Sequence, residues 1–326
     1  MHRRQFLNSS FLGCSLAFSA GRLYAVEQAS EVDRLGKPFT TKWRIGLEVK
    51  AQGGALTGVM ANIPIPTSWP EQEVRITSED HSPQAKPAKY RSVDPGVNQF
   101  QVLIPKLAAG ETAKSVIFVE VIKRNILQPK ETSKYHIPKV AEGPLKKYLQ
   151  KSPLIEIQSS KIKELAEQFA APEESDWKRV EKIFHWVRDN IEYKFDEKLR
   201  GALYAVENSR GDCEEMTSLF VALCRLNGIP ARSVWVPGHC YPEFYLEEDG
   251  VGVWFPCQVA GASPDFGEMA EMRPILQKGD NFKVPEHREP QRYLAEYFKA
   301  KDAAAPPQVR WIREQVLDAT PPASPR

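Results

Sequence analysis

The stretch from Gly211 to Gln258 constrains the fold of this 326-residue chain more than any other. Cys213 follows a polar turn and opens a segment, residues 214–226, in which apolar residues recur at helical spacing before Asn227-Gly228 ends the pattern. The sequence therefore predicts Cys213 at a helix N-terminus. Unpaired backbone N–H groups and the helix dipole favour the thiolate there, and the thiolate is the reactive form of a cysteine.

Extended runs follow this helix. Alternating residues predict strands at 231–236, 239–246 and 251–258, and the acidic loop 247–250 predicts a hairpin between the last two. The register expected for that hairpin has Leu246 opposite Val251. It also brings His239 opposite Gln258 on one face of the sheet and places Cys240 opposite Cys257 on the other, because side chains alternate along a strand.

The order of these motifs resembles the core of the transglutaminase-like superfamily, whose members are relatives of the papain-like cysteine proteases. The resemblance rests on Gly211-Asp212-Cys213, the apolar helix after it, Gly228-Ile229-Pro230-Ala231-Arg232, His239 with Glu243 and Tyr245, Trp254 with Pro256, and an upstream helix at 180–193. It implies an α+β core with an antiparallel sheet at residues 160–262, in which Cys213 is the nucleophile and His239 its proton acceptor. No cofactor is implied.

Gln258 departs from the family pattern, which usually has an aspartate at this place to orient the histidine. A glutamine carbonyl can still accept the ring N–H of His239 and fix its tautomer, but it brings no negative charge to stabilise an imidazolium. Asp265 is an alternative orienting residue, although no strand register places it. The catalytic set expected from the sequence is therefore Cys213, His239 and Gln258.

The remaining cysteines of the core admit different interpretations. Cys224 lies among apolar residues in the helix and is expected to be a buried structural thiol. Cys240 and Cys257 are expected either to be free or to form a cross-strand disulfide, which an oxidising compartment would permit. A metal site that includes His239 is the least favoured interpretation, because no CxxC spacing is present, and we predict no metal.

The flanking segments predict the domain organisation. Short alternating runs at residues 42–125 predict an N-terminal β-sandwich, which transglutaminase-like proteins often carry. A Pro- and Lys-rich connection is expected at 126–159, and residues 263–326 are expected to form a C-terminal extension that is mostly irregular, with a short helix at 292–299. The predicted fold class is α+β, with the sandwich followed by the transglutaminase-like core.

The N-terminal 25 residues resemble a bacterial export signal of the twin-arginine type, with Arg3-Arg4 before a short apolar stretch and Ala25 as a cleavage residue. Export would place the protein in the periplasm or outside the cell. Loss of residues 1–25 removes three arginines and no acid, and it changes the formal net charge from +2 to −1. No nucleic-acid partner and no stable membrane span are therefore expected.

These observations lead to a functional hypothesis. We expect a cysteine enzyme that attacks peptide or glutamine-type amide bonds through a thioacyl intermediate, with water resolving it, so that the protein is a peptidase or amidase acting on a peptide or protein substrate. A protein-crosslinking transglutaminase is one alternative. A non-catalytic module that uses the same fold to bind peptide or cell-wall material is the other.

Overall fold

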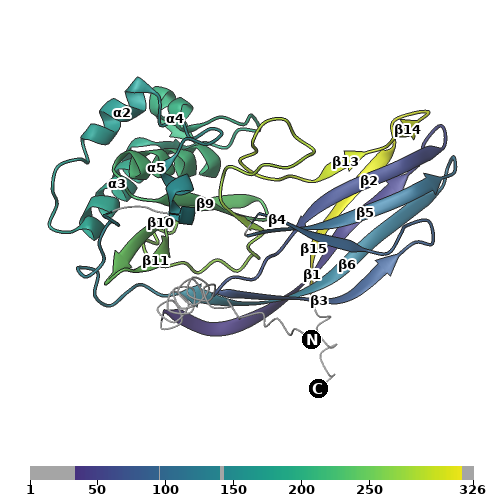
Figure 1. Ribbon diagram of the computed structural model, residues 1–326, viewed down its shortest axis with the longest axis horizontal. Helices are drawn as coiled ribbons and strands as arrows, with labels where there is room; N and C mark the ends of the chain where they lie inside the picture. The colour runs from purple at the N-terminus through teal and green to yellow at the C-terminus, as the bar shows by residue number, and fades with distance from the viewer. Residues whose placement is uncertain (1–33, 95, 140–142, 318–326) are drawn as a thin grey trace, which may run out of the picture.

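The computed structural model describes residues 34–94, 96–139 and 143–317 of the chain. The export signal predicted at residues 1–25 lies outside these residues. Two lobes are seen (Figure 1): a strand lobe built from residues 35–126 and 297–316, and a helical lobe built from residues 143–258. The predicted α+β class is confirmed.

Two sheets form the strand lobe. One has the antiparallel order β15-β1-β6-β3, and strands β4, β5, β2, β13 and β14 belong to the other. The bounds are β1 (Leu35–Lys50), β2 (Leu56–Ile65), β3 (Gln72–His81), β4 (Lys89–Asp94), β5 (Val97–Leu107), β6 (Thr112–Ile126), β13 (Tyr297–Lys299), β14 (Asp302–Ala303) and β15 (Gln308–Val316).

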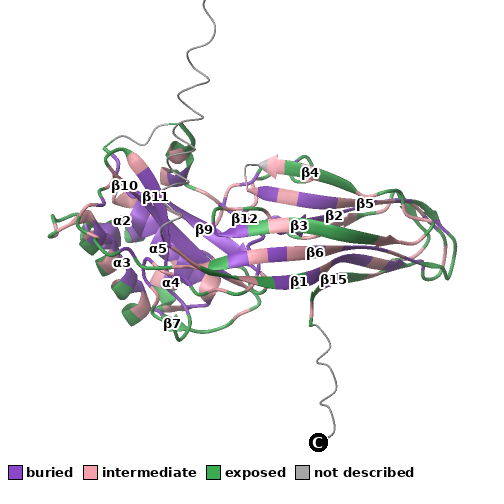
Figure 2. Ribbon diagram, turned by 90° about the horizontal axis from the view of Figure 1, so that it is seen from below, coloured by how far each residue is buried: buried purple, intermediate pink, exposed green. Residues whose placement is uncertain are grey.

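The core of the strand lobe follows from the period-2 pattern of its strands. Ile45, Leu47 and Val49 of β1 alternate with more polar residues, and they are buried against the inward side chains of β2, β5 and β6. Figure 2 shows buried positions along these strands interspersed with intermediate and exposed ones. The predicted β-rich segment at residues 42–125 therefore packs as two facing sheets.

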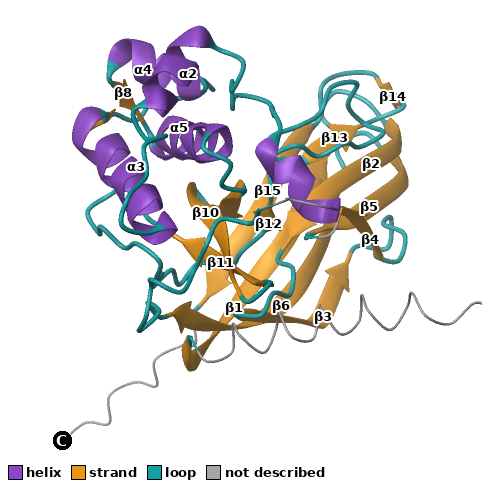
Figure 3. Ribbon diagram, turned by 60° about the vertical axis from the view of Figure 1, so that its left-hand side comes forward, coloured by secondary structure: helices purple, strands orange, loops and turns teal. Residues whose placement is uncertain are grey.

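The helical lobe packs helices on one side of three antiparallel strands (Figure 3). Its elements are η1 (Gly143–Leu149), α2 (Ser160–Glu167), α3 (Asp176–Asn190), β7 (Glu192–Tyr193), α4 (Ala202–Asn208), β8 (Arg210–Gly211), α5 (Cys213–Leu226), β9 (Ala231–Val236), β10 (His239–Glu248) and β11 (Val251–Pro256). Every residue from Glu215 to Arg225 of α5 is buried, because this helix lies between the strands and the other helices.

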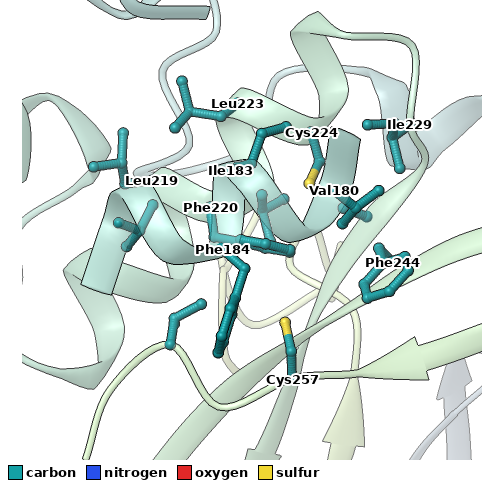
Figure 4. Packing of buried hydrophobic residues seen from close by; sticks show 14 of the residues in the cluster. Val180, Ile183, Phe184, Leu219, Phe220, Leu223, Cys224, Ile229, Phe244 and Cys257 are labelled. Carbon is teal, nitrogen blue, oxygen red and sulfur yellow. The ribbon is translucent and has the colours of Figure 1, made fainter. Parts of the chain in front are cut away.

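The core beneath α5 is apolar and rich in aromatic rings. Figure 4 shows Phe184 of α3, Phe220 and Leu223 of α5 and Phe244 of β10 packed together. The rings of Phe244 and Phe255 stack with centroids 5.4 Å apart. This packing fixes the position of α5, and with it that of its first residue.

The hairpin between β10 and β11 is tighter than the sequence suggested. Asp249 and Gly250 form a two-residue connection with φ values of 53° and 79°, and these positive values fit a type I′ turn. Leu246 consequently faces Val253 rather than Val251. The predicted register was wrong by two residues, and a shift of two leaves every side chain on its predicted face.

The C-terminal residues tie the two lobes together. Strand β12 (Gln277–Lys278) pairs with β9 on one side and with β5 on the other, so that one sheet runs through both lobes in the order β11-β10-β9-β12-β5-β2-β13. Strand β15 pairs with β1 along nine residue pairs. The segment expected as a C-terminal extension is therefore an integral part of both sheets. The short helix expected at 292–299 is wrong, because Tyr297–Lys299 form strand β13, which pairs with β2.

The segment expected as a connection between the domains is also packed. Tyr135 and Ile155 are buried in the core of the helical lobe, and His136 forms a bridge with Glu247 through two backbone hydrogen bonds of 2.8 Å. No helix among the described residues is long and apolar enough to cross a membrane.

Candidate active site

The start of α5 holds Cys213 in place through a capping box. The Asp212 side chain accepts a hydrogen bond from the Glu214 backbone N–H at 2.7 Å, and the Glu215 carboxylate accepts one from the Asp212 N–H at 2.9 Å. Cys213 is thus the first helical residue, as predicted, and it is partly exposed. No partner is present for its backbone N–H among the residues that the structure describes.

His239 and Gln258 meet beside this helix start. His239 is the first residue of β10, after a tight turn in which Gly238 has φ 71°. Gln258 follows β11, and its backbone is held by a 2.6 Å hydrogen bond from Arg188 to its carbonyl. The Nε2 atom of His239 lies 2.9 Å from Oε1 of Gln258. Because this amide oxygen can only accept, Nε2 donates, and Nδ1 is the ring nitrogen left for Cys213.

Electrostatics favours an ion pair between the two groups. The largest effect on the pKa of Cys213 is a hydrogen bond from the Cys240 thiol, which lowers it. Burial raises this pKa, whereas hydrogen bonding to His239 and the charge of His239 lower it further, so that the pKa of Cys213 is about 5. Burial lowers the pKa of His239, but hydrogen bonding to Cys213 and its negative charge raise it above the ordinary value overall. A thiolate beside an imidazolium is the reactive state of such a pair.

Comparison with known proteins fits this geometry. Residues 163–259 match the transglutaminase-like superfamily. The chain contains a transglutaminase-like domain. Cys213, His239 and Gln258 all lie inside the matched range. Comparison of the sequence with curated proteins gives no match.

The two-lobe architecture around the transglutaminase-like domain is shared with a solved structure. It is described as a "putative cysteine protease" from Cytophaga hutchinsonii, and the similarity covers 87% of this chain and 95% of that chain with a TM-score of 0.56 and 16% identity. At this identity the likeness concerns the fold. A second solved structure, described as a "putative protease" from Parabacteroides distasonis, gives a TM-score of 0.29 at 15% identity over 70% of this chain and 44% of that chain, too low to carry an argument.

Cys240 is a site residue that the sequence did not predict. It lies in β10 beside His239 but on the opposite face, and α5 packs against that face with its first residue, Cys213, next to Cys240. The Cys240 thiol donates a hydrogen bond to the Cys213 carbonyl oxygen at 3.4 Å, and the interaction of Cys240 with the Cys213 thiol lowers the pKa of Cys213. The transglutaminase-like domain therefore holds a second thiol beside the candidate nucleophile.

The disulfide considered between Cys240 and Cys257 is not formed. Cys213, Cys224, Cys240 and Cys257 are all free. The observed register ends at the pair Glu243–Pro256, so Cys257 lies beyond the paired part of β11. Its side chain enters the apolar core near Cys224 and Phe244 (Figure 4). The interpretation of Cys224 as a buried thiol agrees with its fully buried position.

Asp265 does not orient His239. Its backbone carbonyl accepts a hydrogen bond from the Gln258 N–H at 2.8 Å, and its carboxylate accepts one from the Ser263 hydroxyl. Asp265 thus supports the loop that carries Gln258. Among the described residues, no group of three His, Cys, Asp or Glu side chains is arranged to hold a metal ion.

Three further side chains interact electrostatically with Cys213, and none is its neighbour in the sequence. Tyr193 of β7 pairs with Gly211 of β8, and burial followed by the Cys213 charge raises the pKa of its phenol. Arg292, from the C-terminal segment, forms an ion pair with Glu214; burial lowers its pKa to about 10, and Cys213 is among the anions that oppose this effect. Arg273 donates to the Pro237 carbonyl at 3.2 Å, in the turn before His239.

Proposed function

We propose that the transglutaminase-like domain is a cysteine peptidase or amidase that cleaves peptide-type amide bonds. The observation that carries this proposal is the arrangement of Cys213, His239 and Gln258, with the Nε2–Oε1 hydrogen bond of 2.9 Å and a Cys213 pKa of about 5. A thiolate present at neutral pH, a proton carrier beside it and an orienting acceptor are the parts that nucleophilic amide cleavage needs.

The reaction proceeds in two stages. The Cys213 sulfur attacks the amide carbonyl carbon, and His239 gives its proton to the leaving amine, so that the C–N bond breaks and a thioacyl enzyme forms. His239 then takes a proton from water, which attacks the thioester carbonyl and releases the acid and the free thiolate. The backbone N–H of Cys213 points from a helix start and is suited to stabilise the oxyanion in both stages.

The side chains around the site favour an apolar peptide segment as the substrate. Tyr193 pairs with Gly211, two residues before the nucleophile, and Phe195 lies two residues farther along the same segment; their side chains are 53% and 69% exposed. Met272, next to Arg273, is 60% exposed. Large apolar side chains exposed near a reactive thiol can cover the apolar side chains of a bound peptide. We therefore expect cleavage next to apolar rather than charged residues.

Hydrolysis is favoured over crosslinking by the neighbouring structure from Cytophaga hutchinsonii, which is described as a putative cysteine protease. The intermediate alone does not distinguish the two outcomes, because water or an amine can resolve a thioacyl enzyme. Incubation with a peptide library and a fluorescent primary amine separates them. We expect new peptide termini, whereas incorporation of the amine at glutamine residues would indicate a transglutaminase.

The decisive experiment begins with the thiol. Limiting iodoacetamide near pH 6, read by peptide mass spectrometry, should label Cys213 far faster than Cys224 or Cys257. Cys213→Ser is the matched variant, since it keeps the size of the side chain and removes the thiol, and it should cleave no library peptide. If Cys213 reacts no faster than in the unfolded chain, and the library stays intact, the binding-module alternative is the better one.

A further inference from the structure

The contact between the nucleophile and a second, buried thiol has a chemical consequence beyond amide cleavage. We propose that Cys213 and Cys240 form a reversible redox pair, in which a hydroperoxide such as hydrogen peroxide oxidises Cys213 and Cys240 captures the product as a disulfide. The disulfide blocks the nucleophile, and a dithiol reductant restores it. This modification site does not depend on which bond the enzyme cleaves.

The fold places the side chains of Cys213 and Cys240 next to each other. Cys213 is the first residue of α5, and Cys240 is the second residue of β10, on the face that α5 covers. The Cys240 Sγ atom is 3.4 Å from the Cys213 carbonyl oxygen, and the Cys240 side chain is close enough to the Cys213 thiol to lower its pKa. Disulfides form between residues whose side chains already lie against each other in this way.

The two thiols differ in the properties that a redox pair requires. Cys213 is partly exposed, and its lowered pKa makes it a thiolate at neutral pH, which is the form that a peroxide attacks. Cys240 is 1% exposed, and burial raises its pKa well above the ordinary value, so that it remains a thiol out of reach of the oxidant. Oxidation therefore begins at Cys213 and is resolved by Cys240.

The oxidation of the two cysteines to a disulfide proceeds in two steps. The Cys213 thiolate attacks one oxygen of hydrogen peroxide; the O–O bond breaks, a sulfenic acid forms at Cys213, and the second oxygen leaves as water after taking up a proton. The Cys240 sulfur then attacks the Cys213 sulfur and loses its proton to the departing hydroxyl, so that the S–S bond forms and a second water leaves. Two thiols lose two electrons, and the peroxide gains them.

The other cysteines are poor partners. Cys224 and Cys257 are fully buried in the apolar core of the helical lobe, where their side chains lie among Phe184, Phe220 and Phe244 (Figure 4). Burial raises the pKa of both thiols well above the ordinary value. They therefore provide matched controls for substitution of Cys240.

The test treats the full-length chain with a slight excess of hydrogen peroxide, alkylates the remaining thiols, and digests without reduction. Trypsin alone leaves Cys213 with Cys224, and Cys240 with Cys257, on shared peptides, whereas further cleavage after glutamate yields residues 211–214 and 233–243 as separate fragments. We expect these two fragments to be linked. Dithiothreitol should break the link and restore the reactivity of Cys213 toward iodoacetamide.

Cys240→Ala distinguishes the pair from simple oxidation of the nucleophile. Without the resolving thiol, Cys213 should gain two oxygens as a sulfinic acid, and dithiothreitol should no longer restore its reactivity. Cys257→Ala should still form the link and recover. Equal recovery in the wild type and in Cys240→Ala would overturn the proposal, as would a link from Cys213 to Cys257.

A second measurement keeps the proposal testable if Cys240→Ala fails to fold. Dimedone traps a sulfenic acid, so the wild-type chain oxidised in its presence should carry little adduct at Cys213 when Cys240 resolves the acid quickly. A dominant dimedone adduct without the linked fragments would refute the redox pair. Peptide cleavage is scored separately, so loss of the disulfide with cleavage intact counts against this inference and leaves the proposed function standing.

Discussion

Strand β10 carries two clusters of charged groups that differ in how far they are exposed to solvent. At its start, His239 lies beside the partly exposed Cys213, and a neutral amide, Gln258, holds the ring. Further along the strand, Glu243 lies in a buried ion-pair cluster with Arg232, Lys278 and Glu71. Its separations between charged nitrogen and oxygen atoms are 2.6 to 2.8 Å.

The two clusters differ in the geometry of their ion pairs and in their exposure to solvent. Each charged group of the ion-pair cluster has a close partner of opposite sign, and the Arg232 guanidinium also lies 3.8 Å from the ring centroid of Trp254. Such a cluster holds elements together, since Glu71 belongs to the chain just before β3, Lys278 to β12 and Glu243 to β10. The Cys213 cluster instead leaves its anion at the surface, where a substrate can reach it. Ion pairs fully shielded from solvent fit a structural role, and an ion pair with a partly exposed anion fits a reactive one.

Lys278→Met is expected to have the largest effect on stability. The variant removes a buried cation that contacts two buried carboxylates, those of Glu71 and Glu243, and leaves them without their shared partner. Loss of one member of a buried ion pair costs about 3–5 kcal/mol. Urea unfolding of the variant measures this loss, and labelling of Cys213 at pH 6 in the folded fraction should be unchanged.

The matched control for this prediction is Lys178→Met, which removes an exposed lysine whose ion pair with Glu181 is 2.6 Å long. Exposed pairs of this kind contribute about 1 kcal/mol or less. Similar losses for the two variants would mean that the buried cluster adds little stability. A slower reaction of Cys213 in Lys278→Met would mean that the two clusters on β10 are coupled.

His239→Ala tests the reactive cluster. Labelling of wild-type Cys213 should rise as the pH passes about 5, where the thiol loses its proton, and then stay level. Without the imidazolium, the pH at which the labelling rate rises moves up toward the ordinary thiol pKa of about 8.5, so the rate at pH 6 falls by up to about 300-fold. The measurement is the rate of iodoacetamide labelling between pH 4 and pH 9.

A rise in the labelling rate at a different pH would identify a different titrating group. Burial raises the pKa of Glu215 to about 7, and this carboxyl is part of the capping box at the start of α5. A step near pH 7 that disappears in Glu215→Gln therefore belongs to the cap. If the labelling rate of Cys213 still rises near pH 5 in His239→Ala, the hydrogen bond from Cys240, rather than the ion pair with His239, stabilises the thiolate.

The sequence was sufficient for the parts of the site that depend on local pattern. Helical spacing after Cys213 predicted its place at a helix start, and strand alternation predicted that His239 and Gln258 share a face. The hairpin register was wrong by two residues because the φ values of Asp249 and Gly250 allow a two-residue turn. The error did not change the face of either residue, since the side-chain period of a strand is two.

Contacts between distant elements could not be predicted in this way. The alternation of side chains along β10 correctly placed Cys240 and His239 on opposite faces of the strand. It does not show, however, that α5 packs on the face that holds Cys240. Arg292 and Lys278 reach the two clusters from the C-terminal segment, where the sequence pattern predicted neither contact, and they are fixed there by ion pairs with Glu214, Glu71 and Glu243. Such positions follow from tertiary packing, which a local pattern does not encode.

Gln258→Glu should have a moderate effect, because the glutamate has the same length and can accept the same hydrogen bond from Nε2 of His239. The added negative charge favours the imidazolium and should raise the pKa of His239 by about one unit. The stability of the ion pair then extends to higher pH, since the imidazolium persists until the higher pKa is reached. NMR titration of the His239 ring measures the shift, and an unchanged pKa would show that Gln258 does not contact the ring in solution.

Phe195→Ser should have the smallest effect and should separate substrate binding from thiol chemistry. The side chain is 69% exposed, so its removal disturbs little packing, and labelling of Cys213 should not change. If the side chain covers an apolar residue of the substrate, KM for apolar peptides should rise about tenfold, as expected for a lost apolar contact of 1–3 kcal/mol. Charged peptides should show no such change. Leu317→Ser, which removes an apolar side chain of similar exposure, 78%, near the end of the described chain, is the control. A rise in KM for both variants would assign the effect to general surface hydrophobicity rather than to a binding surface beside Cys213.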